Sequence, residues 1–235
     1  SDGDTYINED GYYKIKAKIY CKLPAMGYEV ISFEESDTGL DNLRKMTGKN
    51  YIENSKYRFE FNDGSIDMIC ESNVYKDFIR LKDMGNGGDT YDFSPISEDK
   101  EIILSWENFE VYEYDDYKIM VVRGSEKLPK NLENRLSNNE MEEVSYELKI
   151  TLIEGENAEF NLVFDNIIYS HRLRLSVNTN SDAGNSYSQI QNGFYEYDNK
   201  IIDEDWKNVY EEKPVNIYNM DKSVSCTNEE QTLTI

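Results

Sequence analysis

The chain is poor in the residues from which metal sites and disulfide frameworks are built. It has one histidine and three cysteines, Cys21, Cys70 and Cys226, which are widely spaced and form no Cys-x-x-Cys pair. An odd number of separated cysteines excludes a disulfide scaffold and a zinc ribbon, and it favours a reducing compartment. We therefore expect a cytoplasmic protein, and we expect this chain itself to hold no metal and no cofactor.

Basic residues and long apolar runs are also scarce. Lysine and arginine number 25 against 47 aspartates and glutamates, which gives a formal net charge of −22 over 235 residues. Nucleic acids and anionic lipid surfaces repel such a chain, because binding either one requires clustered lysine and arginine. No run approaches the roughly 18 apolar residues that a membrane span requires. We expect neither nucleic acid nor membrane as a partner.

Aromatic residues, by contrast, are plentiful. They make up 13% of the chain and include 19 tyrosines, a composition that excludes disorder in spite of the high charge. The length fits one large β domain or two small ones.

Apolar and polar residues alternate with a period of two along most of the chain, which is typical of half-buried strands. Asp63-Gly64 predicts a hairpin turn, and Pro24 with Gly27 predicts another turn. Residues 127–143 are the only stretch with helical character, and because Pro129 interrupts it we expect mostly extended loop there. Many strands with short turns indicate an all-β fold, an antiparallel β-sandwich. The expected strands are residues 13–20, 28–33, 57–61, 66–70, 101–106, 109–114, 117–123, 144–153, 159–164 and 171–177.

Residues 85–95 form the most unusual segment, with three glycines in four residues followed at once by acidic and aromatic side chains. One interpretation is a loop that faces a ligand, with Asp89 and Asp92 accepting hydrogen bonds from hydroxyl groups and Tyr91 offering a flat surface. The alternative is a tight connection between strands. A calcium loop is a third reading, but the alternating oxygen ligands of an EF-hand are missing.

The single histidine, His171, lies in an expected strand in which Arg172 and Arg174 share the opposite face. An acid or base role is conceivable, but a histidine hydrogen-bonded within the sheet is the preferred interpretation. We expect the two arginines to pair with acidic residues. The polar loop at residues 178–187 could bind sugar hydroxyls or simply connect strands.

No sequence motif identifies a catalyst. The chain has no P-loop, dinucleotide-binding fingerprint, Gly-x-Ser-x-Gly elbow or His-Glu-x-x-His helix. Pairs of acidic residues are numerous, but the sequence does not tell which two carboxylates stand at the separation that a glycosidase needs.

Several segments, in their order and spacing, resemble the C-terminal β region of glycoside hydrolase family 38 α-mannosidases. Together they span most of the chain. The matching segments are Leu23-Pro24-Ala25-Met26-Gly27-Tyr28, Tyr51-Ile52-Glu53-Asn54, Phe59-Glu60-Phe61-Asn62-Asp63-Gly64-Ser65, residues 83–95, His171-Arg172-Leu173-Arg174 with its downstream loop, and residues 206–220 with Glu212-Lys213-Pro214.

The resemblance implies a parent protein that is a retaining α-mannosidase, with an aspartate nucleophile and a zinc ion held by aspartate and histidine. Those motifs would lie upstream, in an N-terminal catalytic domain that is the expected partner of this chain, and the substrate would be an α-mannoside oligosaccharide or glycoside. By motif position the resemblance makes Tyr91 the substrate-facing residue, with Gly88, Asp89 and Asp92 as further contacts. It implies no catalytic residue in this chain.

The resemblance also implies a division into domains. Residues 1–45 would be leading β-strands that close a preceding β segment, followed by a linker, and residues 46–235 a galactose-mutarotase-like supersandwich that stops before the family's β region is complete. We expect a carbohydrate-facing, structural domain without activity of its own, with an apolar surface for docking onto the catalytic domain. The alternatives are a stand-alone carbohydrate-binding or adhesion module and a mutarotase-type epimerase, which would need histidine chemistry.

Overall fold

The computed structural model describes residues 24–32, 44–89, 93–97, 99–114, 117–137, 139–180, 185–197, 208, 219–228 and 231–235. The chain divides into two compact units, Ser1–Leu40 and Asp41–Ile235.

In the first unit the expected turn forms, because the backbone N–H of Gly27 donates to the carbonyl of Pro24 at 3.1 Å. The strand expected from Tyr28 is wrong over residues 28–32, which are not in a strand. Tyr28 and Val30 are 84% and 78% exposed. Alternation selects the face that a strand would bury, but it does not supply the neighbouring strand that pairs with its backbone. The strand expected at residues 13–20 lies outside the described residues.

The second unit consists of antiparallel strands and, among the described residues, one short helix. Its elements are β1 (Arg44–Lys45), β2 (Tyr51–Glu53), β3 (Tyr57–Asn62), β4 (Ser65–Cys70), β5 (Asn73–Tyr75), β6 (Ile79–Gly85), β7 (Ile102–Leu104), β8 (Asn108–Tyr114), β9 (Tyr117–Pro129), α1 (Leu132–Ser137), β10 (Met141–Ile153), β11 (Glu159–Phe164), β12 (His171–Val177), β13 (Asn185–Ile190), β14 (Gly193–Tyr197), β15 (Val224–Thr227) and β16 (Thr232–Thr234).

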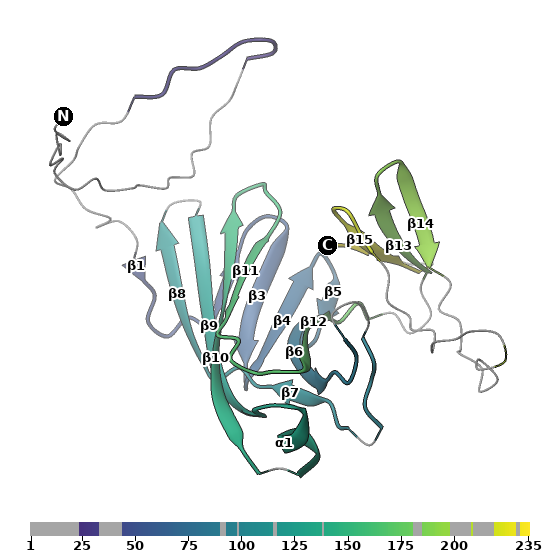
Figure 1. The fold of residues 1–235 in the computed structure, drawn as a ribbon. Helices are drawn as coiled ribbons and strands as arrows, with labels where there is room; N and C mark the ends of the chain where they lie inside the picture. The colour runs from purple at the N-terminus through teal and green to yellow at the C-terminus, as the bar shows by residue number, and fades with distance from the viewer. Residues whose placement is uncertain are drawn as a thin grey trace, which may run out of the picture. The chain divides into compact units, whose positions relative to one another are not determined.

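These strands form four antiparallel sheets (Figure 1). The largest has five strands in the order β1-β8-β9-β10-β11, and a four-stranded sheet has the order β2-β3-β4-β5. A small sheet, β12-β6-β7, carries the glycine-rich loop, and the sheet β14-β13-β15-β16 contains the last strands of the chain. The expected all-β class and antiparallel sandwich are confirmed.

One hydrophobic core joins the inner faces of the five-stranded sheet and the β2-β3-β4-β5 sheet. Phe59 of β3 is fully buried, with its ring 5.4 Å from that of Phe160 on β11, and the ring of Phe61 lies 4.8 Å from that of Phe109 on β8. Each buried aromatic side chain of this kind contributes roughly 1.5–3 kcal/mol to stability. The core is therefore built by the alternating residues from which the sandwich was predicted.

The hairpin predicted at Asp63-Gly64 joins β3 to β4. Both residues have positive φ, 44° and 79°. That pair of values is characteristic of a type I′ turn, whose twist matches the twist of the two strands.

The expectation of an extended loop over residues 127–143 is wrong. β9 continues to Pro129, β10 begins at Met141, and α1 lies between them. The side chain of Asn131 accepts a hydrogen bond from the backbone N–H of Asn134 at 3.0 Å, which caps the start of the helix. Pro129 interrupts nothing, because it stands at the end of its strand.

Candidate functional site

The glycine-rich segment forms the connection from β6 to β7. Within it, Gly88 and Asp89 are exposed. Two other residues expected to contact substrate, Tyr91 and Asp92, lie outside the described residues, so their role stays a prediction.

Asn86 organises the base of this loop. Its backbone N–H donates to the carbonyl of Ser170 at 2.9 Å, and its side-chain oxygen accepts from the backbone N–H groups of Gly88 at 2.9 Å and Ser94 at 3.1 Å. The N–H of Gly87 donates to the carbonyl of Ser94 at 2.9 Å, and Asn86 forms an antiparallel bridge with Pro95. These bonds close the base of the loop, next to which Gly88 and Asp89 are exposed.

The two arginines of β12 have different environments. Arg174 forms an ion pair with Glu101, as expected. The guanidinium of Arg172 instead lies over the ring of Phe93, at 4.4 Å from the ring centroid. Burial lowers the pKa of Arg172, and the neighbouring Arg174 lowers it further. Arg172 therefore supports the loop by stacking, and the expected pairing holds for one arginine.

His171, the first residue of β12, is hydrogen-bonded within the sheet, as predicted. Its Nδ1 faces a carboxylate oxygen of Asp83 on β6, and its Nε2 lies 2.8 Å from the side-chain oxygen of Asn166. Both ring nitrogens are therefore occupied, and the geometry does not favour an acid–base role toward a sugar.

Asp83 belongs to a buried group of ionisable side chains, which we call the clamp: Asp83, Asp99, Arg135 and His171. Their side chains are 0%, 5%, 3% and 5% exposed. Arg135 of α1 donates to Asp83 and, at 3.5 Å, to Asp99. Buried charges are stable only when they are paired in this way.

Gly85 connects the clamp to the loop. Its N–H donates to Asp99 at 2.6 Å. A Cβ atom at this position would lie 2.3 Å from the side chain of Ile96 and 2.6 Å from that of Arg135. Gly85 therefore permits close approach of the backbone to the clamp.

The clamp and the organising role of Asn86 were not predicted from the sequence. The one available signal was the alternation of Ile79, Leu81, Asp83 and Gly85, which places a carboxylate on the inner face of a strand. A carboxylate in that position needs a charged partner. The partners lie 52 and 88 residues away, at Arg135 and His171.

The polar loop after β12 uses its described amides for structure. Asn178 donates to the carbonyl of Lys76 at 2.8 Å, and Asn180 donates to that of Val74 at 2.7 Å. These bonds fasten the loop to β5 and to the residue that follows it. The interpretation of this loop as a connection between strands is therefore better supported than sugar binding for its first residues. Residues 181–184 lie outside the described part.

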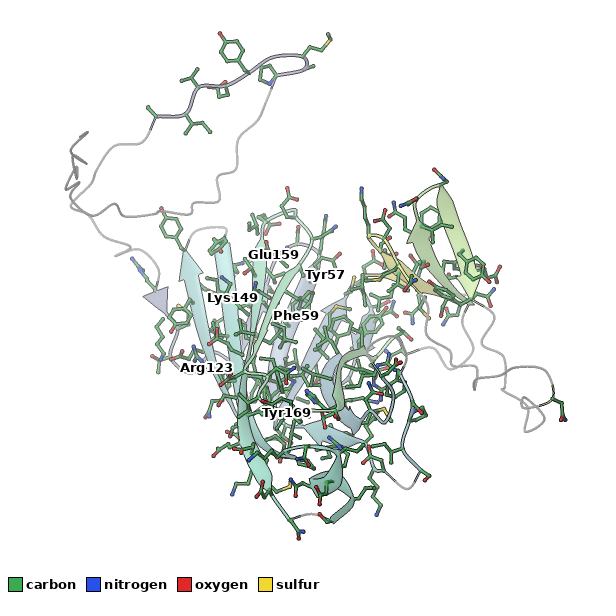
Figure 2. The ribbon with its side chains drawn as sticks, in the orientation of Figure 1. Tyr57, Phe59, Arg123, Lys149, Glu159 and Tyr169 are labelled. Carbon is green, nitrogen blue, oxygen red and sulfur yellow. The ribbon has the colours of Figure 1, made fainter. Side chains whose placement is uncertain are left out.

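Two cavities lie elsewhere in the second unit. A hollow of about 310 Å³ involves Tyr57 and Phe59, which are labelled in Figure 2, and is lined mainly by apolar side chains. A larger, shallow depression of about 610 Å³ crosses the outer face of the five-stranded sheet at Arg123. Its main polar lining residues are Glu107, Asn108, Arg123, Ser125, Ser145, Glu147 and Asp165.

The described residues do not fit a zinc ion. Among them, no group of three or more histidine, cysteine, aspartate or glutamate side chains is arranged to hold a metal. The two cysteines in the described part, Cys70 and Cys226, are free thiols. No helix in this part of the chain is both long enough and apolar enough to cross a membrane.

Comparisons with solved structures identify the same architecture in glycosidases. An α-mannosidase from Enterococcus faecalis V583 shares the fold with a TM-score of 0.69 and 18% sequence identity, over 86% of this chain and 24% of that one. A protein in glycosyl hydrolase family 38 from Enterococcus faecalis has a TM-score of 0.65 and 16% identity, over 88% of this chain and 26% of that one. No protein-family model and no curated protein matches the sequence.

The resemblance to family 38 α-mannosidases is therefore confirmed at the level of the fold. This chain spans about a quarter of the length of these two proteins.

Proposed function

We propose that this chain is the β-sandwich part of a retaining α-mannosidase-like glycoside hydrolase. In this proposal the bond-breaking groups, an aspartate nucleophile and a zinc ion, belong to a catalytic domain elsewhere in the parent protein. The observation that carries the proposal is the fold shared with an α-mannosidase over 86% of this chain.

The glycine-rich loop would form part of the wall of the sugar site. Gly88 and Asp89 project from the base that Asn86 organises, and a carboxylate such as Asp89 accepts hydrogen bonds from sugar hydroxyls. Tyr91 and Asp92 follow within the same loop and would complete the contact.

The catalytic domain would dock on exposed apolar side chains of this chain. Leu136 of α1 and Tyr169, labelled in Figure 2, are 64% and 69% exposed, and Met141 and Ile167 are also exposed. The backbone N–H of Tyr169 donates to the carbonyl of Lys130, which directly follows β9, so these side chains belong to adjoining segments. Apolar side chains exposed in one region often mark an interface.

An activity assay tests the division of roles. The purified chain is incubated with an aryl α-mannoside, with and without added zinc chloride, and release of the aryl alcohol is followed. We expect no turnover above the blank in either condition. Zinc-dependent turnover by this chain alone would refute the proposal.

The natural gene provides a second test. The reading frame upstream of Ser1 should encode a His-x-Asp pair and a second histidine–aspartate set, which together could bind zinc. A reading frame that encodes no such residues would contradict the assignment to an α-mannosidase.

A stand-alone carbohydrate-binding module is the second candidate. The observation that favours it is the exposure of Phe194 and Tyr195 on β14, since exposed aromatic rings stack on sugars. Isothermal calorimetry of the isolated chain against mannose and an oligosaccharide panel distinguishes the two. Tight binding without a catalytic domain would favour the module, and weak or undetectable binding would favour the glycosidase wall.

A further inference from the structure

The clamp fixes both ends of the described loop. The loop leaves β6 directly after Gly85, whose N–H is bound by Asp99, and Asp99 itself stands where the loop returns toward β7. Arg135 joins Asp99 to Asp83, so one guanidinium ties the returning end of the loop to the strand from which it departs. Gly87 and Gly88, between these ends, are exposed and have no side chains with which to pack.

His171 joins β12 to the clamp. Its Nδ1 faces a carboxylate oxygen of Asp83, and its Nε2 lies 2.8 Å from the side-chain oxygen of Asn166. Asp83 is therefore contacted by Arg135 from α1 and by His171 from β12.

We infer that Asp83, Asp99, Arg135 and His171 form a buried clamp that positions the glycine-rich loop. The four side chains act as positioning residues, since none of them projects from the loop toward a ligand. This inference rests on the proposed function only for the purpose of the loop, which is to present Asp89 and its neighbours to a sugar.

Amide hydrogen exchange of the 235-residue chain measures the order of the loop without any sugar. The amides of Gly87, Gly88 and Ser94 are suited to this measurement, because each donates a hydrogen bond inside the loop. Arg135→Gln should accelerate the exchange of these amides by about tenfold or more. In the wild type a local opening of the loop must break the contacts of Arg135 with Asp83 and Asp99, and in the variant these charged contacts no longer oppose the opening. Equal exchange in the variant and the wild type would overturn the inference.

Arg123→Gln is the matched control. It makes the same change of charge at an arginine that is paired with two glutamates but 45% exposed on the five-stranded sheet. It should leave exchange of the loop amides unchanged within about twofold. Should Arg135→Gln fail to fold, Arg135→Lys is measured instead, because lysine keeps the charge but cannot span both carboxylates in the same way. Unchanged loop exchange in Arg135→Lys would likewise count against the clamp.

His171→Gln tests the part played by His171, whose ring contacts Asp83. We expect the loop amides to exchange faster in this variant than in the wild type. Equal exchange in the two proteins would overturn the role of His171 in the clamp.

A titration with methyl α-mannoside separates this inference from the proposed function. In one outcome the loop amides exchange faster in the clamp variants, but no loop amide of the wild type responds to the sugar. That outcome would uphold the clamp and count against a sugar-facing loop. A sugar response that persists in Arg135→Gln with unaltered exchange would uphold the loop and overturn the clamp.

Discussion

Two glycines of the same loop, Gly85 and Gly87, provide a stringent test of how the backbone approaches the clamp. A Cβ atom at Gly85 would lie 2.3 Å from Ile96 and 2.6 Å from Arg135, distances at which something must shift. A Cβ atom at Gly87 would meet its nearest neighbours, a side-chain carbon of Ile96 and the carbonyl of Ser94, at 3.6 and 3.7 Å, which is ordinary contact. Neither glycine has the positive φ that would penalise alanine by itself.

The expected magnitudes follow from this difference. Overpacking a buried site costs about 1–3 kcal/mol, so Gly85→Ala should lower the free energy of unfolding by that amount. For a domain of this size such a loss corresponds to a fall in Tm of roughly 2–12 °C. Both substitutions reduce the entropy of the unfolded chain by a similar amount, worth about 0.4–1 kcal/mol in favour of the folded state. The difference between the two variants therefore reports the crowding at Gly85.

Urea unfolding followed by tryptophan fluorescence measures the effect, with thermal unfolding as a second readout. We expect Gly87→Ala to match or slightly exceed the wild type and Gly85→Ala to unfold at lower urea. Equal midpoints for the two variants would refute the close approach of Gly85 to Ile96 and Arg135. A shift confined to Gly87→Ala would contradict the described geometry of the loop.

Three further predictions concern the sandwich. Trp106→Phe should cost about 1–3 kcal/mol in urea unfolding, because the buried carbonyl of Ile79 loses the indole N–H that donates to it at 3.1 Å. Hydrogen bonds from Lys45 and Arg123 lower the pKa of Glu110 from 4.5 to about 2. The stabilisation by ionised Glu110 is therefore complete above pH 4.5 and is lost as pH falls toward 2. In Glu110→Gln the urea midpoint should depend less on pH between 4.5 and 2 than it does in the wild type. Burial, reinforced by a neighbouring glutamate, raises the pKa of Cys70, so iodoacetamide should alkylate it more slowly in the native chain than in urea.

Much of the sandwich could be predicted because its signals are local. Asp63-Gly64 specifies a type I′ turn by residue type alone, and residues 159–164 and 171–177 alternate over the same spans that β11 and β12 occupy. β6 was not predicted, because Asp83 and Gly85 interrupt its apolar alternation at the positions where the loop and the clamp need them. The partners of Asp83 come from elements far along the chain, and no local pattern specifies which buried charges will meet.

The candidate site was predicted only in part for the same physical reason. Composition identified the glycine-rich loop, because glycines followed by acidic and aromatic residues are unusual in any context. What holds the loop in position is a set of contacts among residues that look ordinary in sequence: a short helix, a strand end and a single histidine. Asn131, which caps that helix, is a residue type that indicates a helix start. The helix was not predicted because Pro129, two residues earlier, indicates an interruption there.

The choice of charged groups for the clamp has a structural consequence. An apolar cluster of similar volume would hold β6, α1 and β12 together at lower desolvation cost, but it would not determine where the loop backbone lies. Asp99 accepts a hydrogen bond from the N–H of Gly85, and this bond is directional. Arg135 donates to the carboxylates of Asp83 and Asp99 and so helps to set the distance between them. Two adjacent glycines of the loop, Gly87 and Gly88, are exposed and contribute no side-chain packing, so directional bonds at the ends of the loop help to limit its conformations. Apolar replacement of Asp83, Arg135 and Asp99 together should therefore preserve the stability of the sandwich better than it preserves the order of the loop.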